Sequence, residues 1–210
     1  MEGCVSSGEY QLNRYHQVIN SGQLPADEVA QIALCIESSF GGTITREDAH
    51  NHMAGELVFV AHTADESGAT TPEVAGFTSV EMVSPADEFQ DATLSGEVGA
   101  YFAAAAIASA HQSRGLYRQF VDERFRFALE HDAGFIYTRT QNPRVLRGIT
   151  TRLEHAIVDG EISRYALEVQ LAHKAYKTML TATKPDVRGT IFERLDYDAS
   201  DAYLLTWFLS

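Results

Sequence analysis

The most informative stretch of the sequence is a short polar turn, Gln112-Ser113-Arg114-Gly115-Leu116-Tyr117, between an expected buried strand and an expected helix. The first amides of a helix have no intrahelical partner, and the helix dipole adds positive potential there. Such a turn can bind a pyrophosphate with its backbone alone. Gly115 lacks the Cβ that would crowd a phosphate, and Arg114 and Arg118 can add charge at the rim. His111 is expected to be solvated, with contact to a phosphate as the alternative. The turn therefore predicts a site for a phosphate-containing molecule.

The turn must be positioned by the elements on either side of it. Small and apolar residues over 98–108 predict a buried strand, and apolar residues at helical spacing predict a helix over 115–131. Residues 135–140 are typical of a strand, and Asn142-Pro143 begins a helix that is expected to end near Leu153. A strand, a helix and a strand in this order form a right-handed crossover. We therefore expect the two strands to be parallel neighbours.

The rest of the chain supplies further elements around this crossover. The patterns predict a helix over 25–38, a short helix over 45–53, a hairpin of strands 57–62 and 73–83, a strand over 162–171 and a closing strand over 201–210. Residues 1–24 are interpreted as a loosely attached lead-in, and residues 25–210 as a single domain. Residues 172–200 carry no readable pattern. The fold class expected is mixed α/β.

The turn at 112–117 resembles the Q/R-x-x-G-x-G/A motif of the GNAT superfamily of N-acetyltransferases. The order around it is similar as well, with a strand before it, a helix and a strand after it, and then Asn142 before another helix. The resemblance covers roughly residues 25–155. It implies a mixed, mostly antiparallel sheet with helices on both faces, in which a central parallel strand pair is split at the cofactor cleft.

The resemblance also implies which residues would hold acetyl-CoA as a co-substrate. The backbone of Ile107, Ala108 and Ser109 would contact the acetyl and pantetheine part, beside a bulge in the strand, and Asn142 would bond to the pantetheine arm. The pyrophosphate would be held by the amides of Gln112, Ser113, Arg114, Gly115, Leu116, Tyr117 and Arg118.

Two positions depart from the family's pattern. Tyr117 is bulky where the family has a small residue, and it either turns outward or narrows the phosphate site. Many relatives carry a tyrosine that protonates the leaving thiolate at about the position of Ile149. Here the general acid would have to come from elsewhere, or water would serve.

Transfer to an amine also needs a group that takes a proton from the amine. Glu97 and Tyr101 share a face of the strand before the turn. Tyr101 falls close to the position of a glutamate that acts as the base in some relatives, and Glu81 on the preceding strand is a third candidate. Each of the three can also be interpreted as an ordinary strand-end or surface side chain.

The composition narrows the range of partners. The net charge of −13 repels phosphate backbones, so no nucleic-acid partner is expected. The longest apolar run, 98–110, is too short for a bilayer, and the first residues lack a signal pattern, so no membrane partner is expected. His50 and His52 have no third ligand nearby, and therefore no metal is predicted. Cys4 and Cys35 form no paired motif, which favours a reducing cytoplasm.

These observations predict an acetyl-CoA-dependent N-acetyltransferase that transfers its acetyl group directly to an amine of a small molecule or peptide. The missing helix tyrosine and the unclear base leave an alternative open, a non-catalytic acyl-CoA sensor or interaction module on the same fold. A homodimer through the C-terminal strand is expected on family analogy only.

Overall fold

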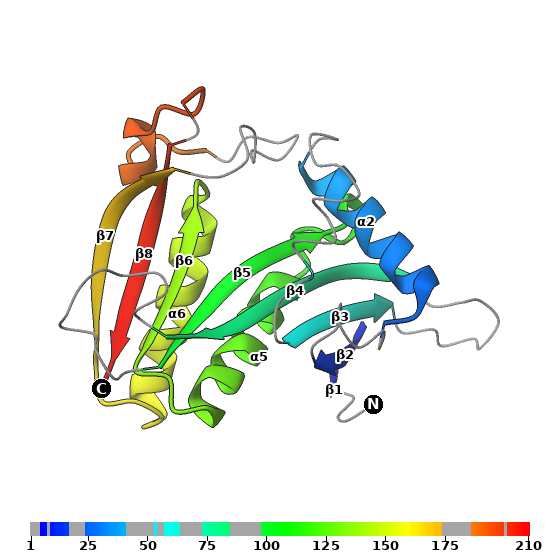
Figure 1. Ribbon diagram of the computed structural model, residues 1–210, viewed down its shortest axis with the longest axis horizontal. Helices are drawn as coiled ribbons and strands as arrows, with labels where there is room; N and C mark the ends of the chain where they lie inside the picture. The colour runs from blue at the N-terminus through cyan, green and yellow to red at the C-terminus, as the bar shows by residue number, and fades with distance from the viewer. Residues whose placement is uncertain are drawn as a thin grey trace. The chain divides into compact units, whose positions relative to one another are not determined.

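A computed structural model describes residues 5–7, 9–16, 24–40, 53, 57–63, 73–84, 98–173, 186–199 and 201–210 of the chain (Figure 1). The chain forms two units, one of Met1–Val80 with Ala103–Phe120 and one of Glu81–Phe102 with Val121–Ser210. The domain boundary drawn at 25–210 stays a prediction. Among the helices in the described ranges, none is both long enough and apolar enough to cross a membrane.

The first unit contains an antiparallel sheet in the order β1 (Val5–Ser7), β2 (Tyr10–His16), β3 (Leu57–Thr63) and β4 (Val74–Val83). The last three residues of β4 belong to the second unit. Six of the seven residues of β3 are buried in an unbroken run. A strand is buried on both faces only when both faces are covered. The buried run therefore marks β3 as an internal strand. Its antiparallel pairing with β4 confirms the predicted hairpin.

Helices cover both faces of this sheet. On one face, helix α2 (Ala26–Phe40) packs Ile32 and Ile36 in a cluster with Val58 and Val60 of β3. On the other face, Leu116 and Phe120 from the start of helix α5 (Leu116–Glu130) pack in a cluster with strand residues that include Ala61 and Ala75. The helix predicted over 25–38 is confirmed as α2. The short helix predicted over 45–53 lies outside the described residues except for Met53.

The interpretation of residues 1–24 as a loosely attached lead-in is wrong for residues 10–16. They form β2, which pairs along its whole length with β3, and Tyr10, Leu12 and Tyr15 are buried. Polar residues interrupt the apolar alternation of this segment, and its partner strand lies more than forty residues away in sequence. Strand pairing between such distant segments leaves no local signal.

The second unit contains the first four residues of β5 (Gly99–Ile107), whose remaining residues belong to the first unit. It also contains β6 (Phe135–Thr140), β8 (Asp201–Leu209) and β7 (Tyr165–His173), and the order across the sheet is β5, β6, β8 and β7. Gly99–Tyr101 pair in parallel with Phe135–Tyr137, whereas β8 is antiparallel to both of its neighbours. A Cβ at Gly99 would lie 2.2 Å from the Phe135 ring, so only glycine allows this approach. The predicted parallel pair and closing strands are confirmed.

Helices α5 and α6 (Pro143–Val158) lie against one face of these strands. The guanidinium of Arg124 lies 4.5 Å from the centre of the Phe102 ring, and the indole N–H of Trp207 donates to Thr150 at 3.4 Å. Trp207, on β8, therefore faces α6. Helix α6 runs five residues past the predicted end at Leu153, because Ala156 extends its buried stripe.

Strand β5 changes its side-chain alternation partway along its length. Phe102 packs against Arg124 of α5, and Ile107 packs against the cluster that contains Leu116 of α5. Side chains five positions apart in a regular strand point to opposite faces. A shift of one residue between Phe102 and Ile107 is therefore required, and such a shift is typical of a β-bulge. This agrees with the bulge expected in this strand.

Candidate functional site

Two residues of the turn before α5 have a left-handed backbone conformation. A short 3-10 helix, Ser109–His111, follows β5, and then Ser113 has φ 64° and Gly115 has φ 84°. Turns that contain left-handed residues can point successive amides toward one concave surface that binds anions. A left-handed conformation is strained for residues other than glycine, so the backbone conformation of Ser113 lowers the stability of the folded state.

Four consecutive amides of this turn, from Ser113 to Leu116, have no hydrogen-bond acceptor among the described residues. Ser113, Arg114 and Gly115 are exposed. A Cβ at Gly115 would meet no atom within 4 Å, so the space beside the backbone is open. Glycine is thus required both by its positive φ and by the room that an approaching anion needs. The assignment of this turn as a phosphate site stays a prediction.

Hydrogen bonds hold the end of β5 and the turn together. The carbonyl oxygen of Ile107 accepts from the side chain of Gln112 at 3.2 Å and from the hydroxyl of Ser39 on α2 at 2.9 Å. The amide of Ala108 donates to the carbonyl of Ala75 on β4 at 2.9 Å. Gln112 was predicted to contact phosphate through its amide, and its side chain now has a second role, that of fastening the turn to the strand.

The same bonds decide which amides near the strand end remain for a ligand. The Ala108 N–H already donates to the Ala75 carbonyl on β4, so it cannot also polarise a thioester carbonyl. Neighbouring amides of an extended strand point in opposite directions. The Ile107 N–H therefore points away from β4, and it is the better candidate of the two for that task.

The N-terminal segment braces the turn from another side. The Tyr10 hydroxyl lies 3.3 Å from Nδ1 of His111, and the two rings meet edge to face with their centroids 5.7 Å apart. Burial raises the pKa of Tyr10, and Glu9 adds to the effect. His111 is buried, so the expectation that it is solvated is wrong. The reason is that β2, which the sequence did not reveal, covers it.

The two arginines near the turn differ in how their charge is used. Arg114 donates a hydrogen bond to Glu9, which raises the pKa of the guanidinium. Arg118 lies one turn further on, is exposed, and forms no ion pair within the described part of the chain. Arg118 is therefore the more available cation for an anion in the turn. Tyr117 is half-buried in the first turn of α5.

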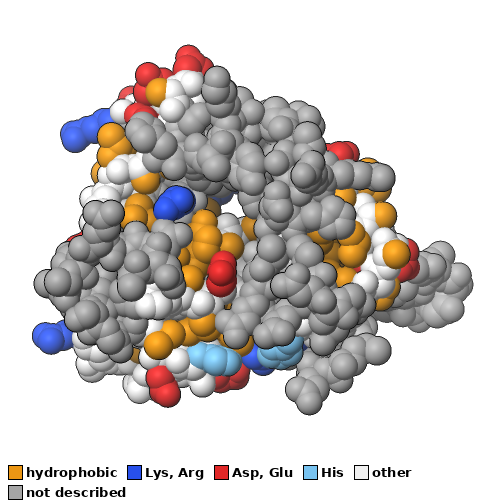
Figure 2. All heavy atoms as spheres, in the orientation of Figure 1, with side chains coloured by type: hydrophobic (Ala, Val, Ile, Leu, Met, Phe, Trp, Pro, Cys, Tyr) orange, Lys and Arg blue, Asp and Glu red, His pale blue; other side chains and the backbone are white. Residues whose placement is uncertain are grey.

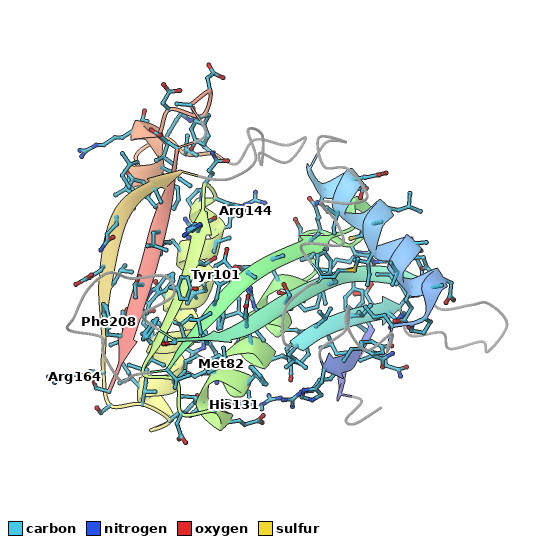
Figure 3. The ribbon with its side chains drawn as sticks, in the orientation of Figure 1. Met82, Tyr101, His131, Arg144, Arg164 and Phe208 are labelled. Carbon is cyan, nitrogen blue, oxygen red and sulfur yellow. The ribbon has the colours of Figure 1, made fainter. Side chains whose placement is uncertain are left out.

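In the second unit, Asn142 caps helix α6. Its side-chain oxygen accepts from the amide of Arg144 at 2.9 Å, and its own amide donates to the Thr140 hydroxyl at 3.0 Å. Only the NH₂ group of Asn142 is left for another bond. Figure 3 shows Arg144 at the start of this helix, where β6 ends. Ile149 is buried, so no acid stands at its position.

The three candidate bases have different surroundings. Glu81 is exposed on β4. Tyr101 stacks on Tyr137, with ring centroids 4.7 Å apart and an angle of 15° between the planes. Glu97 lies outside the described residues. The structure therefore places Glu81 and Tyr101 in the second unit, and the assignment of a base stays a prediction.

No group of three metal-ligating side chains occurs within the described residues. His50 and His52 lie outside them. The residues that the sequence did not connect with the site are Glu9, Tyr10 and Ser39, which brace the turn. Their partners at the turn lie 68 to 105 residues away in sequence, and no spacing rule links segments so far apart.

Strand β8 is paired on both of its edges, with β6 and with β7. Strand β8 therefore has no unpaired edge over this range, and the expected homodimer through the C-terminal strand stays a prediction. Strand β7 is the outermost strand of this unit's sheet.

Comparisons with known proteins address the fold. No protein-family model and no curated protein matches the chain. Among solved structures, Arabidopsis thaliana NAA60 in complex with a bisubstrate analogue has a TM-score of 0.60 and 12% identity, covering 95% of this chain and 99% of that one. The NatC complex bound to Gag peptide and CoA has a TM-score of 0.53 at 12% identity, with coverage of 95% and 99%. The protein therefore has the fold of the GNAT superfamily of N-acetyltransferases.

Proposed function

We propose that this chain is an acetyl-CoA-dependent N-acetyltransferase that transfers an acetyl group directly to an amine of a small molecule or peptide. The observation that carries the proposal is the exposed run of amides from Ser113 to Leu116, on a left-handed turn at a helix start, in a GNAT fold. Similar structures support the choice of ligand, since one NAA60 structure contains acetyl-CoA and the NatC structure contains CoA.

In this proposal the amides of the turn bind the pyrophosphate, and the exposed Arg118 guanidinium lies at its rim. Glu9 holds Arg114, so Arg114 contributes less. The pantetheine arm follows the end of β5 along Ala108 and Ser109. The Ile107 N–H stabilises the charge that develops on the thioester oxygen during transfer.

The reaction needs little covalent chemistry from the protein. The amine nitrogen, once neutral, attacks the thioester carbonyl carbon and forms the C–N bond. The C–S bond then breaks, the CoA thiolate leaves and takes up a proton, and the nitrogen loses its second proton. Positioning and charge stabilisation supply the acceleration. Glu81, Glu97 or, as its phenolate, Tyr101 would accept the proton that the ammonium group loses when it becomes a neutral amine.

Calorimetric titration with acetyl-CoA and with CoA tests the proposal. We expect binding of both, and stabilisation by about 2.7 kcal/mol at a hundredfold excess over Kd. Mass spectrometry of a panel of amines incubated with acetyl-CoA should then show a product heavier by one acetyl group. Absence of binding at millimolar ligand would reject the proposal, and binding without any product would favour the acyl-CoA sensor.

We also propose a cytoplasmic location and a homodimer. A reducing compartment suits Cys35, which is free and buried, and burial raises the pKa of its thiol to about 12. Leu167, Val169 and Leu171 are exposed on the outer strand β7, where a second copy could cover them. Light scattering on the purified chain tests the dimer, and a mass of one chain at all concentrations would reject it.

A further inference from the structure

Ser39, near the end of helix α2, carries a buried hydroxyl that takes no part in the proposed chemistry. Its side chain is buried, whereas Leu34 of the same helix is exposed. Figure 2 shows hydrophobic side chains at the surface over α2. Serine is mostly found at protein surfaces and leucine in cores. Because α2 buries a serine and exposes a leucine, the Ser39 hydroxyl is expected to have a specific partner inside the first unit.

That partner is the backbone carbonyl of Ile107 at the end of β5. The Ser39 hydroxyl donates to it at 2.9 Å, and the side chain of Gln112 donates to the same oxygen at 3.2 Å. A carbonyl oxygen has two lone pairs. Both lone pairs are therefore used by side chains of the protein, one from α2 and one from the turn before α5.

The peptide bond that joins Ile107 to Ala108 is also held from its other side. The Ala108 N–H donates to the Ala75 carbonyl on β4 at 2.9 Å. A Cβ at Gly76 of β4 would lie 2.7 Å from the Ala106 carbonyl oxygen, so glycine allows the two strands to approach closely here. Three hydrogen bonds, from α2, from the turn and from β4, thus fix the orientation of one peptide plane.

The carbonyl and the amide of Ile107 lie on one edge of β5. In a trans peptide the C=O and the next N–H point in opposite directions, so the Ile107 carbonyl points away from β4. The N–H and the C=O of one residue in an extended strand point to the same edge. The Ile107 N–H, which is the proposed donor to the thioester oxygen, therefore lies beside the carbonyl that Ser39 and Gln112 occupy.

We infer that Ser39 is a positioning residue that sets the register of the acetyl donor along β5. A ligand arm that follows a strand edge exchanges donors and acceptors with it, and pantetheine carries amide N–H groups as well as carbonyl oxygens. Since the Ile107 carbonyl already accepts from Ser39 and Gln112, a pantetheine N–H has no acceptor there. Only an acceptor atom, the thioester oxygen, then fits at Ile107. The inference rests on the proposed function and deepens it.

The thiol beside Ser39 does not compete for the acetyl group. Cys35 precedes Ser39 by one helical turn, so both side chains lie on one face of α2. Burial raises the pKa of the Cys35 thiol to about 12, while hydrogen bonds with Ser39 and with the Ala108 backbone oppose the rise. The thiolate is the nucleophilic form of cysteine, and this thiol is protonated at neutral pH. The positioned thioester is therefore left for the amine.

The test compares two neighbouring serines at the end of α2. Ser39→Ala removes the donor to Ile107, and Ser39→Thr keeps a hydroxyl. Ser38→Ala is the matched control, because the Ser38 hydroxyl donates to the Cys35 carbonyl of its own helix at 2.9 Å. Gln112→Met removes the second donor and keeps the backbone amide of the turn, so it provides the same test without a change in α2. Chemical denaturation shows which variants are folded.

Infrared spectroscopy of bound acetyl-CoA, labelled with ¹³C at the thioester carbonyl, reports the register directly. In the wild type the C=O band should lie at a lower wavenumber than in buffer, because the Ile107 N–H polarises the bond. In Ser39→Ala and in Gln112→Met the open lone pair admits a pantetheine N–H, and a second band should appear at the buffer position. Ser39→Thr and Ser38→Ala should give the spectrum of the wild type.

Kinetics with whichever amine of the panel gives a product provide a second measurement. We expect Ser39→Ala to lower kcat about tenfold without raising KM for acetyl-CoA, since the arm binds as well in the wrong register as in the correct one. Ser39→Thr should restore kcat, and Ser38→Ala should leave it near that of the wild type.

The outcomes separate this inference from the proposed function. If the wild type does not bind acetyl-CoA in calorimetry, the proposed function is rejected. If it binds but its C=O band stays at the buffer position, the inference is overturned and the proposed function stands. The inference is also overturned if folded Ser39→Ala keeps the single shifted band, or if Ser38→Ala changes the spectrum as much as Ser39→Ala does.

Discussion

Helices α5 and α6 each follow a strand of the parallel pair, yet their first turns are built in opposite ways. At α6, Pro143 has no N–H, the Arg144 amide donates to the Asn142 side chain, and the Val145 amide donates to the Asn142 carbonyl at 3.0 Å. At α5, the amides from Ser113 to Leu116 have no acceptor among the described residues. The first amides of α6 are therefore hydrogen-bonded within the chain, whereas those before α5 have no acceptor among the described residues.

The difference shows how one structural motif can serve stability or binding. A capped start lowers the free energy of the folded helix by about 1 kcal/mol. An uncapped start forgoes that gain and also carries strain at Ser113, which is left-handed at φ 64°. An anion in the turn would satisfy the open amides and interact with the helix dipole. The comparison therefore supports the proposed ligand site at the start of α5, whereas the backbone amides at the start of α6 are satisfied by Asn142.

The largest effect should come from Gly115→Glu. The side chain would fill the open space beside the turn with negative charge, and we expect acetyl-CoA affinity to fall by at least about a hundredfold. The matched control is Gly160→Glu, since Gly160 also has a positive φ, 74°, with no atom within 4 Å of a Cβ. Both variants carry similar backbone strain, so calorimetry isolates the effect on the turn. Equal loss of affinity in the two variants would contradict the comparison.

Variants at Asn142 divide its capping role from its predicted contact with pantetheine. Asn142→Ala removes both and should lower the free energy of unfolding by about 1 kcal/mol. Asn142→Ser keeps a capping oxygen and loses only the NH₂ group, so stability should stay near that of the wild type while CoA affinity falls a few-fold. Chemical denaturation and calorimetry give the two quantities. If the affinity for CoA is unchanged in both variants, Asn142 caps the helix and does not contact pantetheine.

Tyr10→Phe tests the bracing of the turn by the N-terminal strand. The change removes the hydroxyl that meets Nδ1 of His111 and keeps the ring packing. Loss of one buried hydrogen bond should lower the free energy of unfolding by about 1 kcal/mol and weaken CoA binding only slightly. Tyr15→Phe serves as the control, because the Tyr15 hydroxyl donates instead to Glu28 at 3.0 Å. If both variants weaken CoA binding equally, the contact between Tyr10 and His111 has no specific effect on the turn.

The smallest effect concerns the two arginines. Arg118→Gln should weaken CoA binding about three- to fivefold, and Arg114→Gln should weaken it less, because Glu9 already holds Arg114. Both losses should shrink at high salt, since these side chains are exposed. Calorimetry at two salt concentrations measures the loss of CoA affinity in each variant and shows which loss is larger. A larger loss for Arg114→Gln would mean that the ligand displaces Glu9.

Much of the site was readable from local sequence. The small residues of 98–108, the glycine at 115 and the Asn142-Pro143 pair each reflect a requirement of a few neighbouring residues, and the structure has a strand, a left-handed turn and a capped helix there. The burial of His111 was not readable, because it depends on contact with β2. The role of Ser39 was missed for the same reason, since its partner, Ile107, is distant in sequence.

The sequence by itself determined which backbone segments form helices and strands around the turn, because periodicity, helix caps and glycine act over a few residues. The tertiary structure alone decided that β2 joins the first unit's sheet, that β8 has no free edge, and that Tyr101 stacks on Tyr137. These are pairings between segments far apart in the chain. The free energies of these pairings depend on which partner strand is available, and the residues of one segment do not indicate which distant segment will pair with it.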